Sequence, residues 1–349
     1  MSENKYLVVG ASGVTGGAVA RHLASRGLAV TALSRSGPRR VDTSDQQVLR
    51  GDLSVAGGIA EGALAGVTHV VYAGYVEGAS HAETTALNAE MVVHLLDALD
   101  RDGAEVEHFQ LIGGGKSYGE HLGPYRTPAK ETDRRLLGPI LYNPQEDAIW
   151  EWAARRDAVW TILRPDGVIG FGARSPMNIL SGVAAYAMLS KRENAPLRFP
   201  GSWGAWRALH QATDARILAR AVEWAYGAQT ARNQVFNVTN GDHFRWVHLW
   251  PVIAEFFDMP FDEPQPMELE AHMLGRDADW ADLVLERGLR QPAFDQFVSW
   301  PFVQGWWRTD YDMVQSTIKI RQAGFADCID SHQSFIDHLT ALRDDRFIN

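Results

Sequence analysis

Hydrophobic and polar positions follow two alternating spacings over the first half of the chain. Short apolar runs predict strands at residues 6–9, 28–33, 48–53, 68–73, 108–112 and 159–163. Apolar residues at helical spacing predict helices at residues 14–26 and 86–99. This alternation is typical of a parallel sheet with helices on both faces. We therefore expect an α/β fold, a Rossmann doubly wound parallel sheet.

The pattern changes after residue 165. Helical spacing dominates residues 166–349, with short strand-like runs such as 234–238 and a last helix at 332–343. We expect a dinucleotide-binding Rossmann domain over residues 1–165. Residues 166–349 should form a smaller, mainly helical C-terminal substrate lobe, with some strands returning to the sheet. No apolar run approaches the roughly 20 residues of a membrane helix.

The turn after the first predicted strand has the glycine spacing of a dinucleotide-binding loop. Gly10 permits the tight turn, Gly13 lets the backbone approach the pyrophosphate, and Gly16 lets helix and strand pack closely. The N–H groups at the start of the following helix can bind the phosphates. We predict that Ser12 and Val14 of this loop also contact the cofactor.

The end of the second predicted strand indicates which dinucleotide binds. An NAD enzyme usually has Asp or Glu here, which binds the ribose 2′-hydroxyl. This chain has Ser34 and Arg35, with Arg39 and Arg40 beyond them. Because a guanidinium suits a 2′-phosphate, we expect NADPH. The alternative for Arg39 and Arg40 is a solvated loop.

The third predicted strand ends in Asp52 and Leu53, which we expect beside the adenine. Asp52 could bind the adenine amino group there. The alternative is that Asp52 is a turn residue that ends the strand.

A reductase of this fold needs an acidic O–H near the substrate carbonyl and a nearby cation. The usual YxxxK pattern is absent, because Glu146 stands four residues after Tyr142. Asn143 suits an N-cap, Pro144 the first helical position and Glu146 the third. Tyr142 should therefore stand at the mouth of a helix. We interpret Glu146 and Asp147 as charges near that helix start, not as a carboxylate dyad.

Lys116 is the candidate cation. It follows the fifth predicted strand, at the carboxyl edge of the sheet where ligands bind in this architecture. Tyr142 or Lys116 alone would more often be structural than catalytic. The two together predict a site that polarises a substrate carbonyl.

The segments around these two residues have further features in common with known proteins. The first reads GGGKSY, with Gly123 and Pro124 following, and the second reads LYNPQED. They resemble the segments TGxKHYxGP and NFYYxxED of the plant progesterone 5β-reductase and iridoid synthase family, an atypical extended branch of the short-chain dehydrogenases. The resemblance continues through residues 164–165, 175–178, 199–201, 205–206, 236–242 and 246–250, so it spans nearly the whole chain.

The resemblance implies NADPH-dependent reduction of the C=C bond in an α,β-unsaturated carbonyl compound. Hydride would pass to the β-carbon, and the Tyr142 hydroxyl would stabilise the enolate oxygen while Lys116 makes it a better donor. Further cofactor contacts are expected from Ala73, Gly74, Gly113, Pro165 and Val168, and substrate contacts from Tyr75, Phe171, Met177 and Phe297. Plain packing is the alternative for Pro165, Val168 and Phe297.

The chain also departs from the plant pattern. Ser117 replaces a histidine, Asn143 a second tyrosine, Tyr75 a tryptophan and Gly74 a threonine. The catalytic pair is kept but the pocket changes. We therefore expect a small apolar enone-type substrate without carrying over the plant steroids or monoterpenes.

Composition narrows the remaining choices. The net charge of −10 gives no electrostatic footprint for nucleic acid, and no membrane partner is expected. The single cysteine, Cys328, favours a reducing, cytoplasmic compartment. His108, His210 and His248 lack metal-ligand spacing, so no metal is expected. The 12 tryptophans indicate a bulky core or an aromatic pocket, and a homodimer is compatible with the sequence.

Three other functions stay open from the residues. The same site could reduce a ketone or aldehyde, because both reactions need a donor at the carbonyl oxygen. A non-catalytic dinucleotide-binding sensor would not need both Tyr142 and Lys116. A sugar-nucleotide epimerase or dehydratase would normally have YxxxK.

Overall fold

The computed structural model describes residues 4–35, 46–170, 172, 175, 177–290 and 293–349. The chain forms two compact units. Unit 1 comprises Met1–Gly167, Ala215–Thr239 and Gln315–Asp327, and unit 2 comprises Val168–Asp214, Asn240–Val314 and Cys328–Asn349. The chain therefore leaves unit 1 after Gly167 and returns to it twice, whereas the sequence pattern predicts a single boundary after residue 165.

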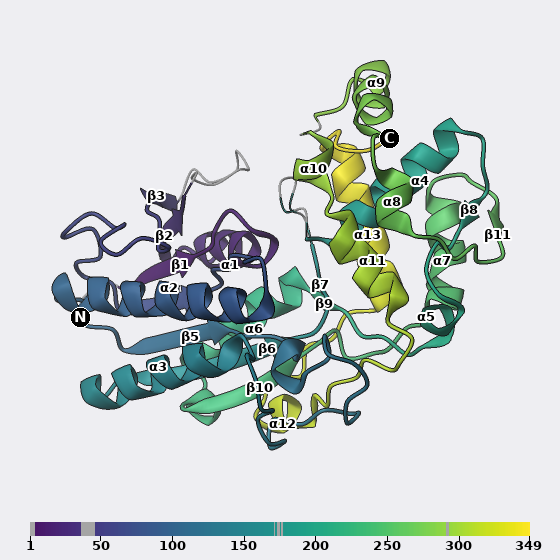
Figure 1. Ribbon diagram of the computed structural model, residues 1–349. Coiled ribbons are helices and arrows are strands. Elements are labelled where there is room, and N and C mark those ends of the chain that lie inside the picture. Colours follow the sequence, from purple (N-terminus) through teal and green to yellow (C-terminus); the bar gives the residue numbers. More distant parts are fainter. Residues whose placement is uncertain (1–3, 36–45, 171, 173–174, 176, 291–292) are drawn as a thin grey trace. The chain divides into compact units, whose positions relative to one another are not determined.

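A seven-stranded parallel sheet forms the centre of unit 1 (Figure 1). Its strand order is β10-β6-β5-β4-β1-β2-β3. The strands are β1 (Lys5–Val9), β2 (Ala29–Ser34), β3 (Gln46–Arg50), β4 (His69–Tyr72), β5 (His108–Ile112), β6 (Val159–Pro165) and β10 (Gln234–Val238). The predicted Rossmann sheet is thus confirmed, with β10 added beside β6 at one edge.

Two pairs of helices cover the sheet, one pair on each face (Figure 1). On one face α1 (Val14–Ser25) packs against α6 (Ala215–Gly227), and on the other α2 (His81–Arg101) packs against α3 (Tyr142–Arg156). The shorter elements of the unit are η1 (Gly115–Tyr118), η2 (Gln229–Ala231) and α12 (Ile318–Gln322).

The apolar faces of α2 and α3 explain why they lie on the sheet. Leu95 and Leu99 of α2 and Ile149 and Trp152 of α3 are buried in one cluster with Phe109 of β5. All five residues of β5 are buried, as expected for a parallel strand that is covered on both faces. Burial of such side chains is worth about 1.5–3 kcal/mol each relative to exposure.

Unit 2 is mainly helical, as the sequence predicts. Its helices are α4 (Ile179–Arg192), α5 (Trp203–Arg207), α7 (Trp246–Phe256), α8 (Leu269–Met273), α9 (Asp277–Arg287), α10 (Phe294–Phe297), α11 (Trp300–Arg308) and α13 (Ser331–Asp344). Two small parallel strand pairs complete it: β7 (Val168–Ile169) with β9 (Thr213–Asp214), and β8 (Leu197–Arg198) with β11 (Phe261–Asp262).

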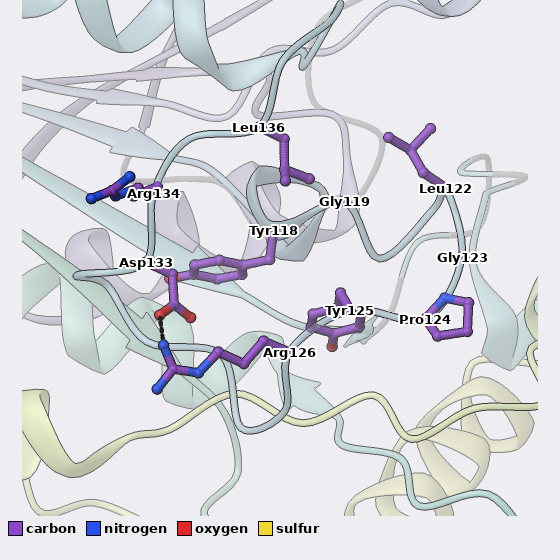
Figure 2. Close-up of a pocket in the computed structure, with 10 residues that line it drawn as sticks. All are labelled: Tyr118, Gly119, Leu122, Gly123, Pro124, Tyr125, Arg126, Asp133, Arg134 and Leu136. Atoms are coloured by element: carbon purple, nitrogen blue, oxygen red, sulfur yellow. Dashed lines mark hydrogen bonds and ion pairs between the residues drawn. The ribbon is translucent and has the colours of Figure 1, made fainter.

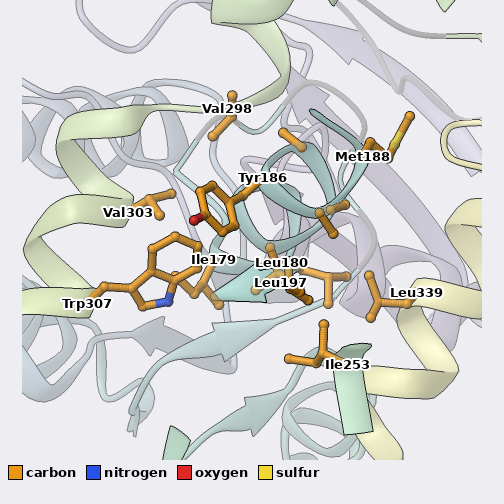
Figure 3. Close-up of a cluster of buried hydrophobic side chains, with 14 of the residues drawn as sticks. Ile179, Leu180, Tyr186, Met188, Leu197, Ile253, Val298, Val303, Trp307 and Leu339 are labelled. Atoms are coloured by element: carbon orange, nitrogen blue, oxygen red, sulfur yellow. The ribbon is translucent and has the colours of Figure 1, made fainter. Parts of the chain in front are cut away.

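The core of unit 2 forms around α4, which is buried along almost its whole length (Figure 3). Many of the chain's tryptophans are buried in this core. Phe199 contacts Trp246, Trp250 and Trp307, with ring centroids 5.2–5.8 Å apart. These tryptophans are almost completely buried, so the bulky-core interpretation holds for them.

Most predicted elements lie within a few residues of their expected places. The last helix, α13, extends the predicted 332–343 by one residue at each end. The helix α2 begins at His81, five residues earlier than the apolar pattern indicates, because Ser80 caps it by accepting a hydrogen bond from the Glu83 N–H. Among the described helices, none is both long and apolar enough to cross a membrane.

Candidate active site

The turn between β1 and α1 is closed by glycines at positions where a side chain cannot fit. Gly10 has φ +77°, and a Cβ there would lie 2.5 Å from the carbonyl oxygen of Ala73. A Cβ on Gly16 would lie 2.4 Å from the carbonyl oxygen of Gly10. Backbone therefore approaches backbone at both positions, which is the close packing that a dinucleotide-binding loop requires.

Gly13 differs from its two neighbours in the motif. A Cβ on Gly13 would come no closer than 3.4 Å, to the Gly10 carbonyl oxygen, so the protein itself leaves room for a side chain. Gly13 is the N-cap of α1, and neither a side-chain cap nor an acidic residue occupies the first turn. The first-turn N–H groups are thus available to an anion, with the helix dipole favouring negative charge.

A cleft extends from this turn across the carboxyl ends of β1, β2 and β4. We call it the glycine-loop cleft. The predicted cofactor residues that line it are Gly10, Ser12, Ser34, Arg35, Asp52, Leu53 and Gly74, together with Tyr75, and its other lining residues are Val9, Leu33, Gly51, Val76 and Met91. Val14 and Gly16 belong to the first turn of α1 beside it. The structure thus brings together residues that the sequence spreads over more than 60 positions.

Asp52 stabilises a turn at the edge of this cleft. Its Oδ1 accepts hydrogen bonds from the Ser54 N–H at 3.0 Å and the Ser54 hydroxyl at 2.6 Å. These bonds lower the pKa of the Asp52 carboxyl. The turn-residue alternative for Asp52 therefore describes its contacts, and its position in the cleft is compatible with the adenine role as well. Arg39 and Arg40 lie outside the described residues.

Lys116 follows β5 on a glycine-rich bend that ends in η1. The Gly113 N–H donates to the Leu163 carbonyl at 2.8 Å, which ties the bend to β6. The Lys116 Nζ lies 5.5 Å from the centroid of the Tyr75 ring, in a cation–π contact. Burial, followed by the charge of Glu77, raises the pKa of Tyr75 to about 12. Since Tyr75 also lines the glycine-loop cleft, this ring connects the cleft with Lys116.

Tyr142 is the first residue of α3, and its hydroxyl lies above the same glycine bend. A Cβ on Gly114 would be 2.9 Å from the Tyr142 Oη. Burial, and then the charge of Glu120 and the nearness of Tyr75, raise the pKa of Tyr142, so the hydroxyl keeps its proton. Tyr75 thus contacts Lys116 and also raises the pKa of Tyr142.

Comparison with known proteins identifies the family. The sequence profile described as PRISE-like Rossmann-fold domain matches residues 53–317. The chain belongs to this family. It is 32% identical to 3-oxo-Delta(4,5)-steroid 5-beta-reductase of Arabidopsis thaliana, over 84% of this chain and 76% of that protein. It is 30% identical to (S)-8-oxocitronellyl enol synthase of Antirrhinum majus, over 82% of this chain and 75% of that protein.

Solved structures show how widely the fold is shared. The PRISE-like chain resembles a short-chain dehydrogenase/reductase superfamily protein from Agrobacterium tumefaciens, solved with bound NAD, with a TM-score of 0.65. The alignment covers 99% of this chain and 98% of that one, at 16% sequence identity. At this identity the likeness establishes the fold alone.

The start of α3 differs from the prediction. The N-cap is Leu141, whose φ of −40° and ψ of −47° are already helical, so Asn143 and Pro144 lie inside the first turn. The Asn143 N–H donates to the Ile140 carbonyl at 3.0 Å, which begins the helix before Asn143 can cap it. The prediction of an Asn143 cap is wrong. The placement of Tyr142 at the helix start is confirmed.

Glu146 also has a different environment from the one expected. Its side chain is fully buried and accepts hydrogen bonds from Arg164 of β6 at 2.7 Å and from Arg135 at 2.8 Å. Asp147 binds the other side of Arg135 at 2.6 Å. The charges are thus neither a dyad nor a simple helix-start effect, because the buried Arg164–Glu146 pair fixes α3 to β6. This contact holds Tyr142 over the bend.

The sequence does not predict two carboxyl groups that lie in this part of unit 1, those of Glu120 and Asp166. Glu120 lies four residues after Lys116, and its Oε2 is so close to Gly115 that a Cβ there would be 1.8 Å away. Asp166 follows Pro165 at the end of β6 and is 1% exposed. A carboxylate at the carboxyl end of a central strand was the available signal for Asp166. Glu120 had no such signal, because a loop places it.

A second cavity of about 370 Å³ opens beside Tyr118, within the loop that follows η1 (Figure 2). Leu122 and Leu136 form apolar parts of its lining, and Arg126 is paired with Asp133 at 3.0 Å. The Tyr118 hydroxyl donates to the Asn237 Oδ1 of β10 at 2.6 Å, and Arg164 lies 5.2 Å from its ring. The Tyr118 ring thus lines this cavity and also contacts Arg164 of the buried Arg164–Glu146 pair.

The remaining predicted residues fall in several places. Pro165 ends β6 in unit 1, opposite Val238 of β10. Val168 begins β7 in unit 2, and Met177 precedes α4 there. Phe297 is fully buried in the core of unit 2 and stacks on Trp280 at 5.2 Å, which gives it a packing role. Phe171 lies outside the described residues. Cofactor contact by Pro165 and Val168, and substrate contact by Phe171, Met177 and Phe297, stay predictions.

Proposed function

We propose that this PRISE-like protein is an NADPH-dependent reductase of the activated C=C bond in α,β-unsaturated carbonyl compounds. The observation that carries the proposal is the position of Tyr75. Its ring lines the glycine-loop cleft and contacts Lys116, which supports a dinucleotide site next to the proposed catalytic residues of unit 1.

The relatives support the choice of reaction. The Arabidopsis protein is named for the 5β-reduction of a 3-oxo-Delta(4,5)-steroid, and the Antirrhinum protein for forming an 8-oxocitronellyl enol. Both names describe a carbonyl compound, and a reduced C=C bond or an enol at that carbonyl. The chain is accordingly an oxidoreductase with a dinucleotide cofactor, and the names of these relatives support the proposed specificity for enones.

The residues supply the electrostatics of this reaction. When bound in the glycine-loop cleft, the nicotinamide cofactor would supply the hydride for the β-carbon of the substrate. Negative charge then develops on the carbonyl oxygen, where the protonated Tyr142 hydroxyl donates a hydrogen bond. Lys116 would make that hydroxyl a better donor. A proton adds to the α-carbon to complete the saturated product, so one hydride and one proton are consumed for each C=C bond.

The Tyr142 hydroxyl should decide the rate. A screen of small linear and cyclic enones, followed by NADPH oxidation and product analysis, tests the proposal. Tyr142→Phe should lower kcat by about 10²–10³ because one oxyanion donor is lost. The control is Tyr6→Phe, since Tyr6 is a buried tyrosine near the start of β1, at the amino edge of the sheet. Reduction of the C=O bond in place of the C=C bond, or an active Tyr142→Phe variant, would contradict the proposal.

The preference for NADPH is a separate part of the proposal. Ser34 and Arg35 line the cleft at the end of β2, where an NAD enzyme would have a carboxylate. Arg35→Ala should raise KM for NADPH by about 10–100-fold through loss of a charge-assisted hydrogen bond, with KM for NADH nearly unchanged. Arg26→Ala is the matched control, because Arg26 follows α1 and pairs with Glu223. Equal effects on both cofactors would refute a 2′-phosphate contact.

A further inference from the structure

The Lys116 ammonium group makes a direct contact with the aromatic ring of Tyr75. Its Nζ lies 5.5 Å from the centroid of that ring, within the range of a cation–π contact. Among the residues that the structure describes, none binds this Nζ in an ion pair or a hydrogen bond. Lys116 is half-buried, and its charge sits on a flexible stem of four carbons. The Tyr75 ring is therefore the described contact that restrains the position of this charge.

The Tyr75 ring holds a cation without cancelling its charge. Burial, and then the charge of Glu77, raise the pKa of Tyr75 to about 12, so the phenol is neutral near pH 7. The face of a neutral ring attracts an ammonium group through its quadrupole and carries no net charge of its own. An ionised carboxylate in the same place would cancel the positive charge. Glu120 does not do so, since no ion pair joins it to Lys116 and burial raises the pKa of its carboxyl well above the usual range.

The backbone beside Tyr75 is fixed by a buried side chain of α2. The Asn88 Oδ1 accepts a hydrogen bond from the Val76 N–H at 3.0 Å, and the Asn88 Nδ2 donates to the Val76 carbonyl at 2.6 Å. The Gln145 Nε2 of α3 donates to the Asn88 carbonyl at 3.0 Å. Asn88 is fully buried, so water does not compete for these bonds. They join the segment that carries Tyr75 to α2 and to the helix that begins with Tyr142.

We propose that Tyr75 is a positioning residue, whose ring holds the Lys116 ammonium group in place and leaves its positive charge available to the reaction. This inference rests on the proposed reductase function. Lys116 then strengthens the Tyr142 hydroxyl as a donor to the substrate oxygen, because no carboxylate cancels its charge. The ring carries this role and the phenol oxygen does not. Another aromatic residue should therefore replace Tyr75, whereas an aliphatic residue should not.

Kinetics at saturating NADPH separate this role from simple lining of the cleft. Tyr75→Leu should lower kcat for enone reduction by about 2–30-fold, which corresponds to the strength of a cation–π contact. Tyr75→Phe and Tyr75→Trp should recover most of that loss. Phe256→Leu removes a ring of unit 2 that the Arg343 guanidinium contacts at 4.4 Å, and it should leave kcat unchanged. A higher KM for NADPH with an unaltered kcat in Tyr75→Leu would make Tyr75 only a wall of the cleft and overturn the proposal.

Nuclear magnetic resonance of the lysine side chains tests the contact without any substrate. Reductive methylation with labelled formaldehyde gives few N-methyl signals, because the chain has five lysines: Lys5, Lys116, Lys130, Lys191 and Lys319. Lys116→Arg assigns the signal of Lys116. In the wild type, the ring current of Tyr75 should shift the Lys116 methyl protons upfield of those of the exposed Lys130. This shift should persist in Tyr75→Phe and vanish in Tyr75→Leu.

The spectroscopic and kinetic measurements can fail separately. An upfield Lys116 signal without any enone reduction would reject the reductase function, and with it the role in the reaction, but keep the contact. Enone reduction with an unshifted Lys116 signal in the wild type would reject the contact alone, whether or not a variant folds.

Discussion

At Gly16 a side-chain carbon would lie 2.4 Å from the carbonyl oxygen of Gly10, whereas at Gly13 it would come no closer than 3.4 Å. The two glycines of one loop therefore serve different partners. Gly16 is required by the packing of α1 on the β1 turn. Gly13 leaves open space at the helix start, which a phosphate group would need.

Alanine substitutions should separate these two roles. Gly16→Ala should destabilise the fold by about 1–3 kcal/mol, because backbone must move to admit the methyl group. Gly13→Ala should change the free energy of unfolding by less than about 1 kcal/mol, yet weaken NADPH binding. Urea denaturation measures the first effect, and titration of NADPH fluorescence the second. Normal NADPH binding by Gly13→Ala would show that the phosphates do not approach this residue.

At the scale of elements, the amino ends of β4 and β5 carry a buried aromatic cluster. His69 and His108 are register partners on these strands, and Tyr226 of α6 lies 4.8 Å and 5.2 Å from their rings. The His108 Nε2 is 2.8 Å from the Thr161 Oγ1 of β6. Burial, and then the neighbouring His69, lower the pKa of His108 to about 3. The cluster is thus built for neutral histidines.

This cluster should make the fold sensitive to acid. The unfolded chain protonates His108 below its ordinary pKa of about 6.5, while the folded chain does not until about pH 3. Stability is therefore complete above about pH 6.5 and falls as the pH is lowered toward 3. Between pH 7.5 and 5, His108 should account for a loss of about 2 kcal/mol in the free energy of unfolding.

Two variants isolate that contribution. His108→Gln keeps a polar group beside Thr161 and should remove about 2 kcal/mol of the pH dependence measured by urea denaturation. His272→Gln, at an exposed histidine of α8, should leave the pH dependence unchanged. An unaltered dependence in His108→Gln would mean that His108 titrates normally in the folded protein.

The elements also show where sequence patterns suffice. Strands β1 and β2 were predictable because buried parallel strands are nearly continuous apolar runs, and α1 was predictable because the glycines at its start have a fixed spacing. The start of α3 was not predictable, because Leu141 adopts helical backbone angles that its side chain does not encode. Asn143 does not cap the helix, because its N–H instead donates to the carbonyl of Ile140 in the preceding loop.

At the scale of the whole molecule, one part of the candidate site was predictable from the sequence and the other part was not. Its dinucleotide half is a local motif, so Gly10 and Gly16 could be assigned from spacing and backbone geometry alone. Its catalytic half depends on segments that meet only after folding. The resemblance to a family indicated Lys116 and Tyr142, but the Tyr75–Lys116 contact and the buried Arg164–Glu146 pair required the structure.

The division into units predicts how fragments behave. Residues 1–167 contain six of the seven strands but lack β10, α6 and α12. A fragment of these residues should not fold cooperatively, because the edge of β6 and the face of α1 that packs on α6 would be uncovered. Circular dichroism during thermal melting tests this, with the full chain as control. A sharp melting transition in the fragment would show that the returning segments are dispensable.

The late arrival of β10 has a consequence for synthesis on the ribosome. About 70 residues separate the end of β6 from the start of β10. At a translation speed of about 5–20 residues per second, the open edge of β6 waits several seconds for its partner strand. A nascent chain at that stage presents an unpaired parallel strand to its surroundings. Slowing of elongation within this stretch should therefore increase the demand for chaperones that shield strand edges.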